Sequence, residues 1–242
     1  MDNDSKYLTF LKKEKVSADA YSFYFAKPEG FEYLPGQYIR IVLEQPINDG
    51  RGNMRFFTLT SSPTENNLII TTRIIQSSFK KNLVSLYEGA KVAYQGPYGN
   101  FVFDPRNKRP RVYLAGGIGV TPFRSMALYA RDKNITNISM TIIASFSLSD
   151  DIIYMDEFKN LKEKLNNFDY IVTVTKPELS KLSWDGETGR IDAEKIKKYV
   201  SNISGSYYFI AGPSVMVSAL SEVLKTLNID RENIKTENFP GY

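Results

Sequence analysis

Residues Arg55-Phe56-Phe57-Thr58-Leu59-Thr60-Ser61-Ser62-Pro63 carry more structural information than any other stretch of this chain. Their aromatic and hydroxyl-bearing side chains are typical of an extended strand, on which successive side chains point to opposite faces. Arg55 and Phe57 then share one face of the strand, and Thr58 lies on the other. A permanent cation, a flat apolar ring and a hydroxyl placed so close together suit a cofactor that is both anionic and aromatic.

A glycine-rich loop, Gly116-Gly117-Ile118-Gly119-Val120-Thr121-Pro122, is the second informative segment. It follows an apolar run, Val112–Ala115, that predicts a strand, and it precedes a predicted helix. Glycines allow the backbone to approach a pyrophosphate without a clash from Cβ, and ligands of α/β sheets bind at the ends of the strands. We expect Thr121 to cap the helix and Pro122 to be its first residue. The two segments together predict two nucleotide cofactors held face to face, and so electron transfer.

The composition excludes several kinds of chemistry. The chain has 242 residues, enough for one large domain or two ordinary ones, and it contains neither cysteine nor histidine. Disulfides, thiolate nucleophiles, cysteine-ligated iron–sulfur clusters and the usual zinc sites are therefore excluded, and we expect no metal site. Redox chemistry then has to reside on an organic cofactor or on a partner protein.

The net charge is mild, at +4 from 31 basic and 27 acidic residues. Basic residues occur in pairs such as Lys80-Lys81, which form a solvated surface or, alternatively, a docking face for an acidic electron carrier. No basic stripe indicates nucleic-acid binding, and no apolar run reaches the roughly 20 residues of a membrane span. The amino-terminal residues are polar, unlike a signal peptide, so we expect a cytoplasmic protein.

The amino-terminal part predicts a small antiparallel β-barrel. One helix, Phe79–Tyr87, interrupts it, because apolar residues recur there at helical spacing. The predicted strands are rich in aromatic and β-branched residues and are bounded by turn formers: Tyr7–Lys13, Ala20–Ala26, Tyr38–Glu44, Met54–Thr60, Leu68–Ile75 and Lys91–Gln95.

Beyond a polar, proline-containing linker at Asp104–Pro110, strands alternate with helices. This alternation predicts a parallel sheet covered on both faces, and hence an α/β domain at 106–242 after a barrel domain at 1–105. The predicted strands are Val112–Ala115, Ser139–Ala144, Tyr170–Thr175 and Tyr207–Ile210. The predicted helices are Pro122–Lys133, Asp156–Leu165, Ile191–Val200 and Pro213–Leu227.

The order of the motifs resembles the ferredoxin–NADP reductase superfamily, in which a flavin-binding barrel precedes a nicotinamide-binding α/β domain. The resemblance covers nearly the whole chain, without a fused iron–sulfur domain. It rests on the two segments above and on three others: Leu34-Pro35-Gly36-Gln37-Tyr38, Gln95-Gly96-Pro97-Tyr98-Gly99-Asn100-Phe101 and Ala211-Gly212-Pro213-Ser214-Val215-Met216. We interpret the second of these as a turn that closes the barrel.

The resemblance implies a flavin site in the barrel domain. Arg55 would pair with the cofactor phosphate, and the Thr58 hydroxyl would bond N5 or O4 of the ring. Phe57 stands where the family has tyrosine, and a helix capped by Ser77 or Ser78 would hold the phosphates. The implied flavin-binding residues are Arg55, Phe56, Phe57, Thr58, Thr72, Arg73, Ile74, Ser78, Phe79, Lys80, Phe239 and Tyr242.

It also implies a nicotinamide nucleotide site in the α/β domain. Ala211 replaces a cysteine that lies near the nicotinamide in many members. Ser145 and Ser147 suit a 2′-phosphate, whereas Asp150 and Asp151 oppose one, so NADH and NADPH both stay open. The implied NAD(P)-binding residues are Gly116, Gly117, Gly119, Val120, Thr121, Pro122, Ser145, Ser147, Ala211, Gly212, Pro213 and Met216.

The function implied is passage of a hydride from NADH or NADPH to bound FAD, with FMN the less favoured flavin, and of electrons onward to ferredoxin or another small redox protein. Thr58, Thr121 and Tyr242 are the expected catalytic residues. In relatives an aromatic tail covers the flavin ring, and the resemblance gives that place to Tyr242 or Phe239 here. Two alternatives remain. One is an electron-transfer subunit that is active only with its partner, and the other is a nucleotide-binding module without turnover.

Overall fold

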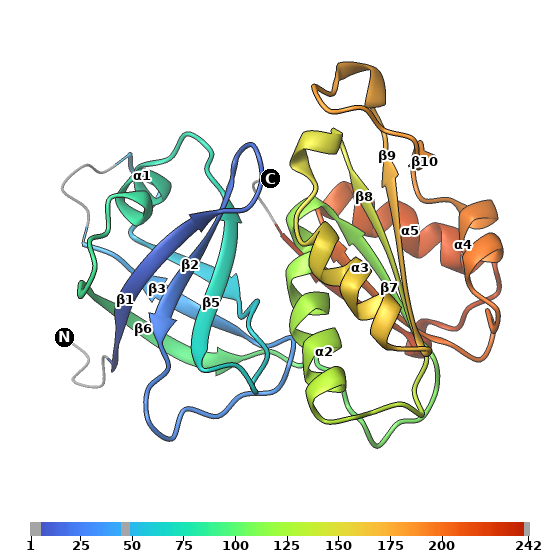
Figure 1. The fold of residues 1–242 in the computed structure, drawn as a ribbon, viewed down its shortest axis with the longest axis horizontal. Coiled ribbons are helices and arrows are strands. Elements are labelled where there is room, and N and C mark those ends of the chain that lie inside the picture. Colours follow the sequence, from blue (N-terminus) through green and yellow to red (C-terminus); the bar gives the residue numbers. More distant parts are fainter. Residues whose placement is uncertain (1–5, 45–48, 240–242) are drawn as a thin grey trace.

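The computed structural model describes residues 6–44 and 49–239, which form two units lying side by side (Figure 1). The amino-terminal unit is built on an antiparallel sheet and the carboxyl-terminal unit on a parallel sheet, each of six strands. The predicted barrel followed by an α/β unit is thereby confirmed. Within the described residues, no helix is both long and apolar enough to cross a lipid bilayer.

The first sheet has the strand order β4-β3-β6-β1-β2-β5. A bridge between Leu59 and Ile70 joins the end of β4 to β5 and so closes the barrel. The helix α1 (Ser78–Val84) begins at Ser77, whose hydroxyl accepts a hydrogen bond from the Lys80 amide at 3.1 Å. The strands are β1 (Lys6–Lys15), β2 (Ala20–Ala26), β3 (Tyr38–Val42), β4 (Met54–Thr58), β5 (Asn67–Arg73) and β6 (Lys91–Tyr98).

The second sheet has the order β10-β9-β8-β7-β11-β12, and all its strand pairs are parallel. Every residue of the central strand β7 is buried, as a strand covered on both faces requires. The strands are β7 (Arg111–Gly116), β8 (Met140–Phe146), β9 (Phe168–Val174), β10 (Glu187–Thr188), β11 (Tyr207–Gly212) and β12 (Ile234–Asn238).

Helices cover both faces of this sheet. Phe123 of α2 and Phe158 of α3 belong to one apolar core, and Ile196 of α4 and Leu220 of α5 belong to the other. The α-helices are α2 (Thr121–Asp132), α3 (Met155–Lys164), α4 (Ala193–Tyr199) and α5 (Ser214–Thr226). The short 3₁₀ helices are η1 (Gly117–Val120), η2 (Ser149–Asp151), η3 (Pro177–Leu179) and η4 (Arg231–Asn233).

The predicted helix cap at Thr121 is wrong. The glycine loop winds into the 3₁₀ turn η1, which runs straight on into α2, and Val120 already has helical dihedral angles. The residue before α2 is therefore not extended, as a helix cap would be. Thr121 is instead the first helical residue, with Pro122 after it, and its hydroxyl donates to the Ile118 carbonyl at 2.9 Å.

One other expectation needs correction, and two strands were missed. The segment Gly96-Pro97-Tyr98, expected in a turn that closes the barrel, continues the strand β6. The two-residue strand β10 and the edge strand β12 were not predicted. β12 has the sequence Ile-Lys-Thr-Glu-Asn, which is too polar to read as a strand, and it forms because β11 offers it a free edge.

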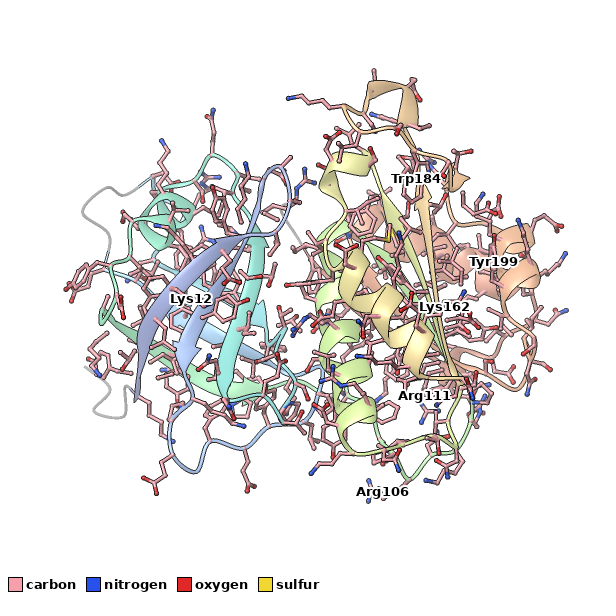
Figure 2. All side chains as sticks on the ribbon, viewed as in Figure 1. Lys12, Arg106, Arg111, Lys162, Trp184 and Tyr199 are labelled. Atoms are coloured by element: carbon pink, nitrogen blue, oxygen red, sulfur yellow. The ribbon has the colours of Figure 1, made fainter. Side chains whose placement is uncertain are left out.

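The two ends of the parallel sheet carry different groups. Figure 2 shows Arg106 and Arg111 at the lower end, where β7 begins, and Trp184 near β10 on the side away from the barrel. The glycine loop lies at the opposite, carboxyl-terminal end of β7. A ligand at that end therefore cannot use the cations of the lower end.

Gly119 is held by a close backbone approach. A Cβ added there would lie 2.1 Å from the Ala211 carbonyl oxygen, whereas one added at Gly117 would meet nothing within 4 Å. We expect Gly119→Ala to lower the free energy of unfolding by about 1–3 kcal/mol, the usual cost of overpacking. Gly117→Ala, at a φ of 52°, should cost about 1 kcal/mol. Chemical denaturation of both variants checks the difference, and equal losses would contradict the close approach.

Candidate functional site

Two cavities open where the two units meet. The first, the barrel cavity, has a volume of about 550 Å³, and the second, the sheet-end cavity, has about 340 Å³. Ile118 of the glycine loop and Phe239, just after β12, line both. Two ligands bound in these cavities would therefore meet at a shared wall.

Most of the barrel cavity wall comes from β4 and its surroundings, and part comes from the other unit. The residues that line it are Tyr38, Arg51, Met54, Arg55, Phe56, Phe57, Thr58, Thr71, Ile75, Ser77, Lys80, Ile118, Thr121, Glu237, Asn238 and Phe239. The first eleven belong to the antiparallel unit and the last five to the parallel one. The site is thus complete only when both units are in place.

Cations gather in one part of the barrel cavity. Nη1 of Arg55 donates to the carbonyls of Arg51, Gly52 and Met54 at 3.0, 3.2 and 2.6 Å, and its guanidinium lies 5.3 Å from the ring centre of Phe79. These contacts hold the Arg55 side chain against the loop that precedes β4.

Lys80 is a buried cation in the same cavity, only 4% exposed. Its ammonium donates to the Thr72 hydroxyl and lies 5.1 Å from the ring centre of Phe57. Burial, with a smaller contribution from Arg55, lowers the pKa of Lys80 to about 7. A bound anion would offset that cost by stabilising the charged ammonium.

A carboxylate lies at the start of α1. Asp49 accepts a hydrogen bond from the Ser78 amide at 2.9 Å and forms an ion pair with Arg51 at 2.6 Å. The bonds from Arg51 and Ser78 lower the pKa of Asp49 well below its usual range. An anion thus already occupies the place where the sequence predicted phosphate contacts.

Two polar groups face each other across the junction of the units. The Thr58 hydroxyl and Oε2 of Glu237 on β12 are buried next to each other, and neither bonds any other residue that the structure describes. Burial raises the pKa of Glu237 to about 7, although the adjacent Thr58 hydroxyl opposes the shift. Both groups remain available to a ligand with hydrogen-bonding edges.

The sheet-end cavity lies beyond the carboxyl ends of β7, β8 and β11. Gly116 and Gly117 line it, and so does Pro213, which begins the connection to α5. Arg190 contributes a cation from the loop after β10, and Arg73 contributes one from the barrel, where it pairs with Asp19 at 2.6 Å. This is where α/β sheets bind nucleotides.

The structure brings together many of the predicted residues, but not all. Arg55, Phe56, Phe57, Thr58, Lys80 and Phe239 line the barrel cavity, as does Thr121, which was expected on the nicotinamide side. Gly116, Gly117, Ser145, Ser147, Pro213 and Met216 line the sheet-end cavity, together with Arg73. Tyr242 lies outside the described residues. The predicted residues that line neither cavity are Thr72, Ile74, Ser78, Phe79, Gly119, Val120, Pro122, Ala211 and Gly212.

Several of these residues act one layer behind the walls. Phe79 lies fully buried beneath Phe57 and Arg55, with ring centres of Phe57 and Phe79 5.9 Å apart. Gly212 packs on Gly116, and a Cβ added at Gly212 would lie 3.1 Å from the Gly116 Cα. They support the site through packing.

Sequence reasoning missed Glu237, Asp49 and Asp19. Glu237 stands in a polar tail whose pairing with β11 has no local signal, so its position in the barrel cavity could not be foreseen. Asp49 and Asp19 lie in turns that look like ordinary polar connections. Only the folded chain brings Asp19 to the sheet-end cavity and Asp49 to the start of α1.

Comparison with known protein families gives a match in each of the two units. An oxidoreductase FAD-binding domain matches residues 7–103, and an oxidoreductase NAD-binding domain matches residues 113–222. The chain is thus a combination of a flavin-binding and a nicotinamide-binding reductase domain. It belongs to the ferredoxin–NADP reductase superfamily, as the sequence predicted.

Individual relatives are distant. The chain is 29% identical over 226 residues to ferredoxin–NADP reductase B of Sorangium cellulosum, covering 90% of each. It is 28% identical over 232 residues to the glycine betaine monooxygenase reductase subunit of Pseudomonas aeruginosa, covering 94% of this chain but only 62% of that protein. The chain spans about 60% of the length of the first curated relatives that it matches.

Solved structures share the fold. The FAD/NAD-binding domain of nitric oxide dioxygenase from Vibrio cholerae aligns with a TM-score of 0.83 at 20% identity, over 98% of this chain and 99% of that one. A ferredoxin NADP⁺ reductase from Neisseria gonorrhoeae with bound FAD and NADP aligns with a TM-score of 0.80 at 18% identity, over 98% and 99%.

We predict that flavin binding depends on pH through Lys80, because burial lowers the pKa of its ammonium to about 7. A phosphate bound beside Lys80 would raise that pKa again, so above about pH 7 binding would be accompanied by the uptake of a proton. FAD affinity should be highest below about pH 7 and fall above it, by up to about tenfold per pH unit. In Lys80→Met, the slope of log Kd against pH should be smaller by about one proton. Lys81 is an exposed neighbour, so Lys81→Met should leave that slope unchanged. Isothermal titration from pH 6 to 9 measures this, and parallel slopes for the two variants would contradict it.

Proposed function

We propose that this chain is a flavoprotein oxidoreductase that takes a hydride from NADH or NADPH onto bound FAD and passes electrons to an acceptor. The observation that carries the proposal is the shared wall of the two cavities, formed by Ile118 and Phe239. Residues 1–105 would bind the flavin and residues 106–242 the nicotinamide nucleotide. FMN is the less favoured flavin.

A flavin nucleotide suits the barrel cavity. The Thr58 hydroxyl, beside the Glu237 carboxyl, matches a hydrogen-bonding ring edge, and the cations Arg55 and Lys80 match a phosphate. Arg51 lies in the same cavity but pairs with Asp49. When bound, FAD supplies a ring that accepts a hydride from the nicotinamide and releases its electrons to an acceptor. The chain itself binds and orients the two nucleotides and excludes water from the space between them.

The nicotinamide nucleotide belongs in the sheet-end cavity under this proposal. The glycines of the loop admit its pyrophosphate, and Arg190 supplies a positive charge. Arg73 is paired with Asp19 in the same cavity. Ser145 and Ser147 lie where the adenosine end would rest. The Phe239 side chain, which contributes to both cavities, would have to move so that the nicotinamide reaches the flavin.

We further propose that the acceptor is a separate small redox protein. A relative is named a monooxygenase reductase subunit, and another a ferredoxin–NADP reductase. Aromatic side chains are exposed beside the barrel cavity, with Phe56 at 60% exposure and 5.6 Å between the ring centres of Phe56 and Tyr38. Such a rim suits a protein that must approach the flavin. A cytoplasmic location stays a prediction from the sequence.

An anaerobic titration tests the hydride transfer. Protein loaded with FAD should lose its visible flavin absorbance on addition of one equivalent of NADH or of NADPH. The nucleotide that bleaches at the lower concentration is the preferred donor. Retention of full absorbance with both nucleotides would contradict the proposed activity and favour a binding module without turnover.

Arg55→Ala tests the phosphate contact. A charge-assisted hydrogen bond contributes about 1.5–3 kcal/mol, so the Kd for FMN should rise roughly 10- to 150-fold. Riboflavin has no phosphate, and its Kd should change by less than about threefold. Arg106→Ala, at the far end of the molecule (Figure 2), serves as the control. Equal weakening of FMN and riboflavin would show that Arg55 acts only through the loop that it braces.

A further inference from the structure

A third cationic site lies outside both cavities. Arg124 of α2 has a side chain that is only 9% exposed, and all five of its N–H donors are used. Nη1 donates to the Thr60 carbonyl at 3.0 Å and to Glu65 at 2.9 Å, and Nη2 donates to Glu65 at 3.2 Å. Nε and Nη2 donate to Glu157 at 2.6 and 2.8 Å.

These partners belong to different units. Thr60 and Glu65 lie between β4 and β5 of the barrel, while Glu157 lies on α3 of the parallel unit. Arg124 therefore bonds a carboxylate on each side of the junction, both in bidentate fashion, and adds a barrel carbonyl. Figure 1 shows α2 on the side of the parallel sheet that faces the barrel.

Neighbouring contacts fix the same helix. The Ser125 hydroxyl donates to the Ser61 carbonyl at 2.6 Å. The Arg124 guanidinium lies 5.2 Å from the ring centre of Tyr154, whose hydroxyl is 2.5 Å from the Thr71 hydroxyl of β5. The start of α2 is thus joined to the barrel by several directional bonds.

Stability alone is a poor reason for such a cluster. Burying the Arg124 guanidinium, and partly burying Glu65 and Glu157 at 26% and 31% exposure, costs desolvation energy that their attraction only partly offsets. Apolar residues of similar volume often stabilise a protein as well or better. Apolar packing, however, does not fix the relative orientation of the groups that it brings together. Five hydrogen bonds in a planar fork fix both the distance and the orientation of the groups that they join.

The cluster lies next to the site in both units. Thr121, one helical turn before Arg124, and Thr58, on the strand that leads to Thr60, both line the barrel cavity. We propose that Arg124 is a positioning residue that holds the Thr121 side of the junction at a fixed place relative to Thr58, and so sets the approach of nicotinamide to flavin. This rests on the proposed hydride transfer.

The carboxylates provide a matched pair of variants. Glu65→Gln and Glu157→Gln remove the same charge from the same guanidinium, but only Glu65 crosses the junction. At saturating nucleotide, we expect Glu65→Gln and Arg124→Met to lower the hydride-transfer rate constant about 10- to 100-fold, because a misplacement of about 1 Å can cost that much. Glu157→Gln should lower it less than about threefold, and the Kd values for FAD and nucleotide should change little. The rate constant of Arg124→Lys should lie between those of the wild type and Arg124→Met.

Hydrogen exchange of the flavin-free protein gives a readout without turnover. Amides of 61–65 and of the first turn of α2 should exchange faster in Arg124→Met and Glu65→Gln than in Glu157→Gln. Lys162→Gln on α3 removes an exposed ion pair with Asp169 and should match the wild type in exchange and rate.

Stopped-flow reduction by NADH or NADPH separates the possible failures. Equal rates for the two glutamine variants, or unchanged rates in Arg124→Met despite a lower melting temperature, would overturn the positioning role. If Arg124→Met does not fold, the glutamine pair decides. A wild-type protein that binds FAD but is not reduced would instead overturn the proposed function, and the exchange difference would then still test whether Arg124 joins the units.

Discussion

The docking of α2 against the barrel is the interaction on which the rest of the structure depends. Neither cavity belongs to a single unit, since Ile118, Thr121 and Glu237 complete a cavity whose other walls are barrel strands. The buried guanidinium of Arg124 and the Ser125 hydroxyl make that docking directional. A shift of the parallel unit would open the wall that the two cavities share.

Electrostatics prepare the barrel cavity for an anion. Lys80 is kept inside it although burial lowers the pKa of its ammonium to about 7, and Arg55 is braced nearby by backbone carbonyls. Asp49 already supplies a carboxylate at the start of α1. A negative ligand beside these cations would form charge-assisted hydrogen bonds with them. The FAD-binding domain match is consistent with that physical preference.

How far the sequence predicted the site depends on the range of each interaction. Arg55, Thr58 and the glycine loop could be predicted as site residues from their neighbours in the chain, and the structure places them along the two cavities. Thr121 was predicted as a helix cap on the nicotinamide side. It lines the barrel cavity instead, and it is no cap because η1 runs straight on into α2. Glu237 and Arg124 escaped notice, since a carboxylate in a polar tail and an arginine in a helix carry no local signal of burial.

The sequence by itself determined the two units, the order of most of their strands and helices, and the chemistry that they can hold, because hydrophobic periodicity and turn residues act over short distances. It also excluded thiol and imidazole chemistry through the absence of cysteine and histidine. Only the tertiary structure decided which residues face each other across the junction. That decision depends on contacts between segments far apart in the chain, such as Thr60 with Arg124 and Ala211 with Glu237, and no short stretch of sequence encodes them.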